Sequence, residues 1–178
     1  MRLKTVVAMF LLMPSAIAFA EVGVLKKVDN NPVTNEKTES VMLVIGSESA
    51  DARLTVICRH GEVRGRSYNM VGLALNTPDI VVKSQMSPMT IRGGNSVMTL
   101  ARFEGRKMES IVWTRSDDPT MLIHMGGGII GLDSFKFVRD KLFNAVKLHI
   151  QLTPTQTVSF DLVGLSEEYA KHGECKEK

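Results

Sequence analysis

Apolar and polar residues alternate along several short stretches of this chain. Within residues 52–60 the apolar Leu54, Val56 and Cys58 occupy alternate positions, and residues 146–153 alternate more cleanly still. A period of two is typical of strands that bury one face. The same kind of pattern, weaker in places, predicts further strands over residues 39–46, 68–75, 80–82, 97–104, 111–115, 120–125 and 158–162.

Two segments have a helical pattern instead. Apolar residues recur at helical spacing over residues 134–144, with Asp133 or Ser134 as the N-cap. Ser166, followed by two glutamates, is typical of the start of a short C-terminal helix. We therefore predict a mainly β fold of the α+β class. It is an antiparallel sandwich or barrel-like sheet with one helix near 134–144 and a short C-terminal helix.

The N-terminal segment has the composition of a targeting signal. Arg2 and Lys4 precede an apolar run over residues 6–13, and small residues stand at Ala18 and Ala20. This order of charge, apolar run and small residues predicts a secretory signal peptide that is cleaved after Ala20. The run is too short for a membrane-spanning helix. We therefore expect the mature protein in the periplasm, with no transmembrane segment.

Composition changes this picture only slightly. Residues 21–38 are mainly polar and contain a break at Pro32, so we expect a flexible arm there and a single β-rich domain over residues 39–178. The formal net charge is +3, but two of those positive charges are Arg2 and Lys4 of the signal segment. The sequence therefore does not point to an acidic polymer as a partner.

The chain has two cysteines, Cys58 and Cys175. In an oxidising compartment a disulfide is the favoured use of such a pair. The alternative is a pair of free thiols used in catalysis, which would need a nearby base. His60 lies two residues after Cys58 and would share its face of a strand.

A local group of cations and one aromatic residue is the candidate interaction surface. Arg59, Arg64 and Arg66 precede Tyr68 within ten residues. Arginine and tyrosine are enriched in protein–protein interfaces. A nucleic-acid platform would need more aromatic residues and a wider positive field, so no nucleic acid is expected as a partner.

No motif in the chain establishes a catalytic or metal site. Residues 126–131 match the pattern G-x-G-x-x-G, but the expected acidic residue after the next strand is missing and too little chain follows for a dinucleotide fold. His60, His124, His149 and His172 lack metal-ligand spacing. The acid pair Asp117-Asp118 fits a turn. We therefore expect no cofactor, no metal and no enzymatic activity.

Several blocks, taken in order, resemble the VasI/TagO family of type VI secretion-associated proteins. They include residues 31–44, which are similar to the family's entry to its first strand, and residues 54–59, which are similar to its "L-x-L-R-C" strand. Residues 101–104, 113–118 and 158–165 resemble "Y-R-F-D", "W-x-x-S-x-D" and "a-x-F-D-L-S-G-L", respectively. The resemblance implies a mainly β envelope protein without an established catalytic set, and it implies that Cys58 pairs with Cys175.

Two kinds of function remain open. The first is a non-catalytic periplasmic accessory protein that binds envelope proteins, including components of a secretion apparatus. Its expected contacts are the arginine and tyrosine group and the segment from Trp113 to Asp117 and Asp118. A periplasmic inhibitor or exclusion protein would have the same features. The second is a small secreted enzyme or effector that acts on the cell wall, which would need His60, His124 or an acid pair to meet a nucleophile in a pocket.

Overall fold

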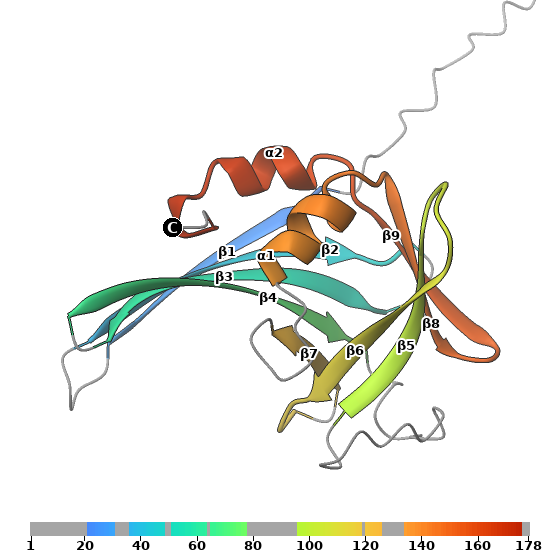
Figure 1. Ribbon diagram of the computed structural model, residues 1–178, viewed down its shortest axis with the longest axis horizontal. Coiled ribbons are helices and arrows are strands. Elements are labelled where there is room, and N and C mark those ends of the chain that lie inside the picture. The colour runs from blue at the N-terminus through green and yellow to red at the C-terminus, as the bar shows by residue number, and fades with distance from the viewer. Residues whose placement is uncertain are drawn as a thin grey trace, which may run out of the picture.

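One curled sheet dominates the computed structural model (Figure 1). The structure describes residues 21–30, 36–48, 51–63, 65–77, 96–118, 120–125 and 134–175. The sheet is antiparallel and has the strand order β1-β2-β3-β4-β7-β6-β5-β8-β9. Its curl makes a half-barrel, which confirms the predicted β-rich, barrel-like fold.

The strands are close to those that the alternating pattern predicts. The pattern ends one predicted strand at residue 60 and begins the next at 68, whereas β3 continues to Val63 and only two residues separate it from β4, which begins at Arg66. Gly65 has a φ of +74°, which suits glycine in a tight hairpin. The strands are β1 (Gly23–Asn30), β2 (Lys37–Gly46), β3 (Arg53–Val63), β4 (Arg66–Asn76), β5 (Ser96–Phe103), β6 (Glu109–Arg115), β7 (Met121–Met125), β8 (Lys147–Thr153) and β9 (Gln156–Asp161).

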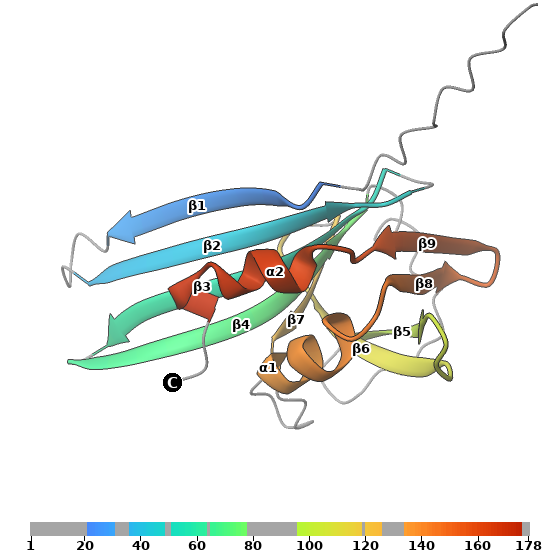
Figure 2. The same ribbon diagram turned by 90° about the horizontal axis from the view of Figure 1, so that it is seen from above.

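The two ends of the sheet approach each other at one point. Ser47, just after β2, forms a bridge with Phe160 of β9. The backbone N–H of Glu48 also donates to the carbonyl of Ser159 at 2.9 Å. Figure 2 shows the result: β1 to β4 run side by side along the long axis, and β5, β6, β8 and β9 lie at the other end.

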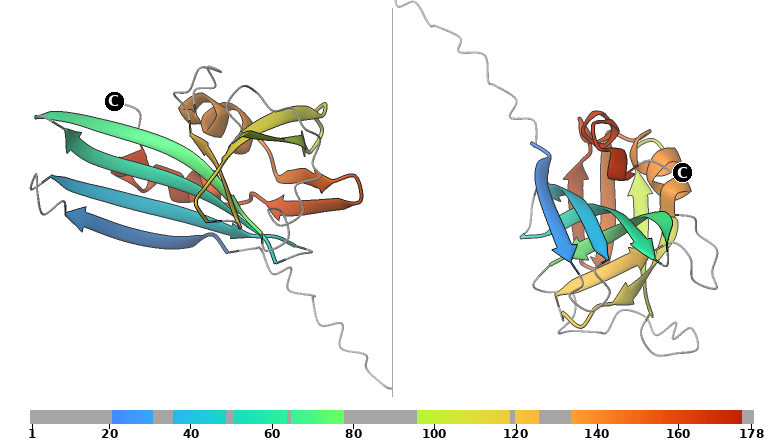
Figure 3. Two further views of the ribbon diagram at one scale, coloured as in Figure 1. Left: turned by 90° about the horizontal axis from the view of Figure 1, so that it is seen from below. Right: turned by 90° about the vertical axis from the view of Figure 1, so that its left-hand side faces the viewer.

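The core lies on the inner face of the curl. Trp113, Phe103 and Phe160 are its largest fully buried side chains, and they come from three different strands. Each strand points alternate residues inward, so the apolar positions of the sequence pattern face one another across the half-barrel. We call the opposite side of the sheet the outer face. Figure 3 shows the curl of the sheet from two further directions.

Short helices cover the inner face. The segments are α1 (Ser134–Phe137), a π-helical turn (Val138–Leu142), α2 (Leu165–Ala170) and a final 3-10 turn (Gly173–Cys175). Cys175 forms a disulfide with Cys58 on the inner face of β3, with their Cα atoms 4.8 Å apart. Both cysteines are fully buried, and the described residues include no free cysteine.

The prediction of a flexible arm over residues 21–38 is wrong for Gly23–Asn30. These residues form β1, which pairs antiparallel with β2 along its whole length, from Gly23 opposite Val44 to Asn30 opposite Lys37. All eight residues of β1 are exposed. Backbone hydrogen bonds to β2 therefore hold this strand. Because none of its residues is buried, its sequence lacks the alternation of apolar and polar positions that predicts a strand.

The predicted helix caps differ from those of the structure. Gly164, with a φ of +81° and no side-chain cap, precedes α2, and Ser166 lies inside its first turn. Asp161 instead accepts a hydrogen bond from the N–H of Val163 at 2.9 Å, which turns the chain before the helix. The Asp133 and Ser134 side chains lie outside the described residues. So do the predicted strand 80–82 and the glycine-rich segment 126–131.

Candidate functional site

The outer face of β1 to β4 brings together three of the four residues in the predicted arginine and tyrosine group. Tyr68 stands opposite Gly61 and Arg66 opposite Val63 in the β3–β4 register. Arg59 lies two residues before Gly61, and alternate residues share a face of the sheet. Arg59, Arg66 and Tyr68 therefore share the face that is opposite to the buried Cys58. Arg64 lies outside the described residues.

Tyr68 lies directly over Gly61. A Cβ atom added to Gly61 would stand 2.6 Å from the Tyr68 Oη and 2.8 Å from its Cε1. Such separations are shorter than real Cβ contacts, so only glycine leaves room for the ring. The glycine therefore allows the Tyr68 side chain to lie across β3, where Tyr68 is half-buried.

Positive charge dominates this face. Among its described residues on β1 to β4, the cations are Lys27, Arg53, Arg59 and Arg66, and the only carboxylate is Asp29. Asp29 forms an ion pair with Lys27 at 2.9 Å. In the described part of the chain, neither Arg59 nor Arg66 has an ion-pair partner. Two guanidinium groups therefore remain able to bind carboxylates of another molecule.

A cross-strand pair next to Tyr68 contains two buried polar atoms. Ser40 of β2 stands opposite Arg59 of β3. The Ser40 Oγ and the Arg59 Nε are both buried, and neither has a hydrogen-bond partner among the described residues. Buried polar atoms usually have partners, because leaving one unpaired costs about 1–3 kcal/mol. The pair is therefore an unusual feature of this face.

An apolar row borders the cations. Leu25, Met42, Ile57 and Gly72 stand opposite one another across β1 to β4. Leu25 is 58% exposed, while Met42 and Ile57 are half-buried. An apolar centre beside polar and cationic groups is the usual composition of a protein–protein interface. We call this row, together with Ser40, Arg59, Arg66 and Tyr68, the docking surface.

Trp113 does not belong to any accessible surface, so its assignment as a contact residue is wrong. Its side chain is fully buried, and its indole N–H donates to the Oγ1 of Thr99 at 2.9 Å. Its ring also meets the ring of His124 edge to face, with centroids 6.1 Å apart. Trp113 points inward on β6 and organises the core.

Asp117 and Asp118 lie in the exposed turn between β6 and β7. The Asp118 carboxylate accepts hydrogen bonds from the N–H of Thr120 at 2.8 Å and from its hydroxyl at 2.7 Å. These bonds lower the pKa of Asp118. The turn adjoins the C-terminal end of β4, because the N–H of Thr77 donates to the Thr120 carbonyl. Arg66 and Tyr68 lie at the other end of β4, so the two predicted contact regions are separate.

The four histidines do not converge on one pocket. The Nδ1 of His60 donates to Asn69 at 2.6 Å, and the Nδ1 of His124 donates to the carbonyl of Val112 at 2.8 Å. Within the described ranges, no three His, Cys, Asp or Glu residues lie close enough to hold a metal ion. His149 and His172 bond to Ser159 and Glu168, respectively, on other elements.

Sequence reasoning missed the part of the docking surface that comes from β1 and β2. Leu25 falls in the segment interpreted as an arm, and Ser40 belongs to the surface only because it pairs with Arg59 across β2 and β3. Gly61 lies outside both of the strands predicted over residues 52–60 and 68–75. The sequence signal for its role is that Gly61 directly follows one predicted strand and lies seven residues before Tyr68, which begins the next.

No helix in the described ranges has both the length and the apolar character needed to cross a membrane. A search of protein-family models, curated proteins and solved structures found no match to this chain.

Proposed function

We propose that this protein is a non-catalytic binding module of the cell envelope, which docks an acidic surface of an envelope protein on its outer face. The observation that carries the proposal is the docking surface itself. Its arginines have no ion-pair partners among the described residues, and they adjoin an apolar row in which Leu25 is exposed and Met42 and Ile57 are half-buried. Contact with a partner would remove the apolar row from water, and each guanidinium group would bind a carboxylate through two parallel hydrogen bonds.

The proposed location outside the cytoplasm rests on two supports. The sequence of residues 1–20 has the order of features of a secretory signal. The Cys58–Cys175 disulfide is compatible with an oxidising compartment such as the periplasm. Cleavage after Ala20 is part of this proposal.

The proposed partner class follows from the resemblance to the VasI/TagO family. That resemblance favours an accessory role beside a type VI-like secretion apparatus. A periplasmic inhibitor or exclusion protein would use the same surface, and the identity of the partner separates the two roles.

Photo-crosslinking in cells tests the proposal. A photoreactive residue replaces Met70, which lies on the outer face opposite Arg59, and in a second strain it replaces Lys107 in the exposed β5–β6 loop. We expect Met70 to crosslink to a specific envelope protein, and Lys107 to give no such product. The Arg59→Glu/Arg66→Glu variant should lose the product. A product that persists at full yield in this variant would contradict the assignment of the docking surface.

A further inference from the structure

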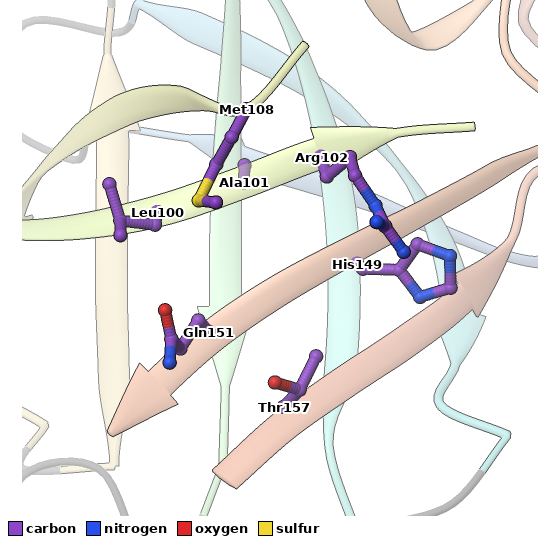
Figure 4. A pocket seen from close by; sticks show the side chains of 7 residues that line it. All are labelled: Leu100, Ala101, Arg102, Met108, His149, Gln151 and Thr157. Carbon is purple, nitrogen blue, oxygen red and sulfur yellow. The ribbon is translucent and has the colours of Figure 1, made fainter. Parts of the chain in front are cut away.

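A separate hollow opens on the outer face of β5, β8 and β9, away from the docking surface (Figure 4). Its volume is about 240 Å³. Sites for drug-sized ligands span roughly 300–1,000 Å³, so this hollow can hold only a smaller molecule or one residue of a peptide. The side chains that line it are Leu100, Arg102, Met108, His149, Gln151 and Thr157.

One end of the hollow is suited to an anion. Arg102 of β5 stands opposite His149 of β8, and Figure 4 shows the Arg102 side chain reaching toward the His149 ring. The exposed Arg102 has no ion-pair partner in the described part of the chain. His149 uses its Nδ1 for a 2.8 Å hydrogen bond with the Oγ of Ser159, which leaves its Nε2 for another partner. When Ser159 donates this bond, Nε2–H is a donor.

The nearest carboxylates on this face belong to a different row. Asp161 stands opposite Lys147, and Glu104 also acts on Lys147. The ion pair between Lys147 and Glu48 at 2.8 Å is the main cause of the raised pKa of Lys147, and Asp161 and Glu104 add to it. Within the described ranges Arg102 forms no ion pair with a carboxylate, so it remains the cation of the hollow.

The other end of the hollow combines polar and apolar groups. Gln151 stands opposite Thr157 on β9 and opposite Leu100 on β5. The Gln151 side-chain N–H donates to the carbonyl of Pro154 at 3.3 Å, so its Oε1 remains able to accept from an amide N–H. Leu100 is 39% exposed and Met108 is 60% exposed, and they form an apolar wall.

We propose that this hollow binds a small organic acid in which a carboxylate, an amide and an apolar side chain adjoin one another. This is the chemistry of an N-acylated amino acid and of the last residue of a peptide. The carboxylate binds Arg102 and the His149 Nε2, the amide binds Gln151 and Thr157, and the apolar side chain covers Leu100 and Met108. The inference does not depend on the docking surface.

Titration of the disulfide-bonded protein with N-acetyl-leucine, followed by NMR, tests the site. We expect saturable shifts confined to the residues of the hollow, with affinity at least fivefold weaker for N-acetyl-leucinamide, which lacks the carboxylate. Arg102→Gln should weaken binding of N-acetyl-leucine at least fivefold. The matched control Arg115→Gln, at another exposed arginine, should leave binding unchanged.

A second arm separates the two sources of the ligand. An acetylated Gly-Gly-Gly-Leu peptide that binds more tightly than N-acetyl-leucine identifies a peptide terminus, whereas equal affinity identifies a small acid. The proposal is overturned if no saturable shift occurs up to millimolar probe, if the amide binds as well as the acid, or if Arg102→Gln has no effect. Because these experiments use no envelope partner, their failure would leave the docking proposal unaffected.

Discussion

At the scale of single residues, one missing Cβ atom shapes the docking surface. Gly61 lies under the ring of Tyr68, and any side chain there would occupy the position of the ring. The residue that matters most for the shape of this surface is therefore one without a side chain. Strand propensity alone would disfavour glycine at this position.

Replacing this glycine should destabilise the protein. Gly61→Ala forces the far end of the Tyr68 side chain to move, and because this half-buried ring can swing away we expect a cost at the low end of the roughly 1–3 kcal/mol that overpacking takes from the free energy of unfolding. Gly46→Ala is the matched control, because an added Cβ there meets nothing within 4 Å. Chemical denaturation measures both. Equal effects of the two substitutions would contradict the packing of Tyr68 on Gly61.

The hydrogen bond between Trp113 and Thr99 gives a second prediction at this scale. Thr99→Val leaves the buried indole N–H without its acceptor, which should lower the free energy of unfolding by about 1–3 kcal/mol. In a Trp113→Phe background the same change should cost less, because no indole N–H remains. A double-mutant cycle measures this difference. Additive effects of the two substitutions would show that the bond contributes nothing.

At the scale of elements, the C-terminal segment is attached to the rest of the protein by a disulfide and by the contacts of Tyr169. Cys175 is bonded to Cys58, and Tyr169 of α2 donates a hydrogen bond to the Cys175 carbonyl. The Tyr169 ring also packs edge to face on Phe143, with centroids 4.6 Å apart. The disulfide closes a loop with a sequence separation of 117 residues, so it restricts most of the unfolded chain.

Loss of the disulfide should therefore be costly. In the chain-entropy model a loop of this length contributes about 4–5 kcal/mol to the free energy of unfolding. We expect Cys58→Ala/Cys175→Ala to lower the melting temperature clearly, and reduction of the wild-type protein to do the same. The double variant itself serves as the control, since a reductant should not change its melting temperature. An unchanged midpoint in the reduced wild type would contradict this role.

The charges of α2 predict a dependence on pH. The ion pair with Lys171 at 2.6 Å, with a contribution from His172, lowers the pKa of Glu168 below its usual value of 4.5. A lowered folded-state pKa stabilises the protein above the unfolded pKa, and this contribution is lost as the pH falls through the folded pKa.

We therefore expect the wild type to be more stable than Glu168→Gln at pH 6, and the difference to shrink as the pH falls below 4.5 toward 3. Thermal unfolding at a series of pH values measures this difference. Glu167→Gln, on the same helical turn, is the comparison variant. A difference between wild type and Glu168→Gln that stays constant with pH would contradict the ion pair.

Elements with one buried face were predictable from the sequence, and those without one were not. The alternation in β3 and β8 reflects burial of every second side chain, so it located both strands. In β1 no side chain is buried, and only its pairing with β2 makes it a strand. Likewise, the pattern over residues 134–144 indicated a helix but not that Val138–Leu142 would form a π-helical turn.

The candidate site was predictable only in part, for a related reason. The local spacing of Arg59, Arg66 and Tyr68 was enough to group them, because strand parity and a tight hairpin are local properties. Ser40 and Leu25 join them through pairing between strands, which the sequence does not specify. Trp113 was predicted at the surface because it precedes a polar turn. Only the register of β6 shows that its side chain points into the core.

At the scale of the whole molecule, the strands of one sheet serve two different surfaces. The outer face of β1 to β4 carries the docking surface, and the outer face of β5, β8 and β9 carries the hollow with Arg102 and His149. The inner face and the disulfide hold the sheet in its curled form. The two surfaces can therefore be altered separately by exposed substitutions that leave the core intact.

In the proposed function, the docking surface binds an envelope partner through its arginines. The most direct test is the dissociation constant of the crosslinked partner for the wild type, for Arg59→Glu/Arg66→Glu, and for the control Lys107→Glu/Arg115→Glu, which changes the net charge equally at two exposed cations. We predict that the first variant binds at least tenfold more weakly and that the control binds like the wild type. Affinities within twofold of one another for all three proteins would contradict the account.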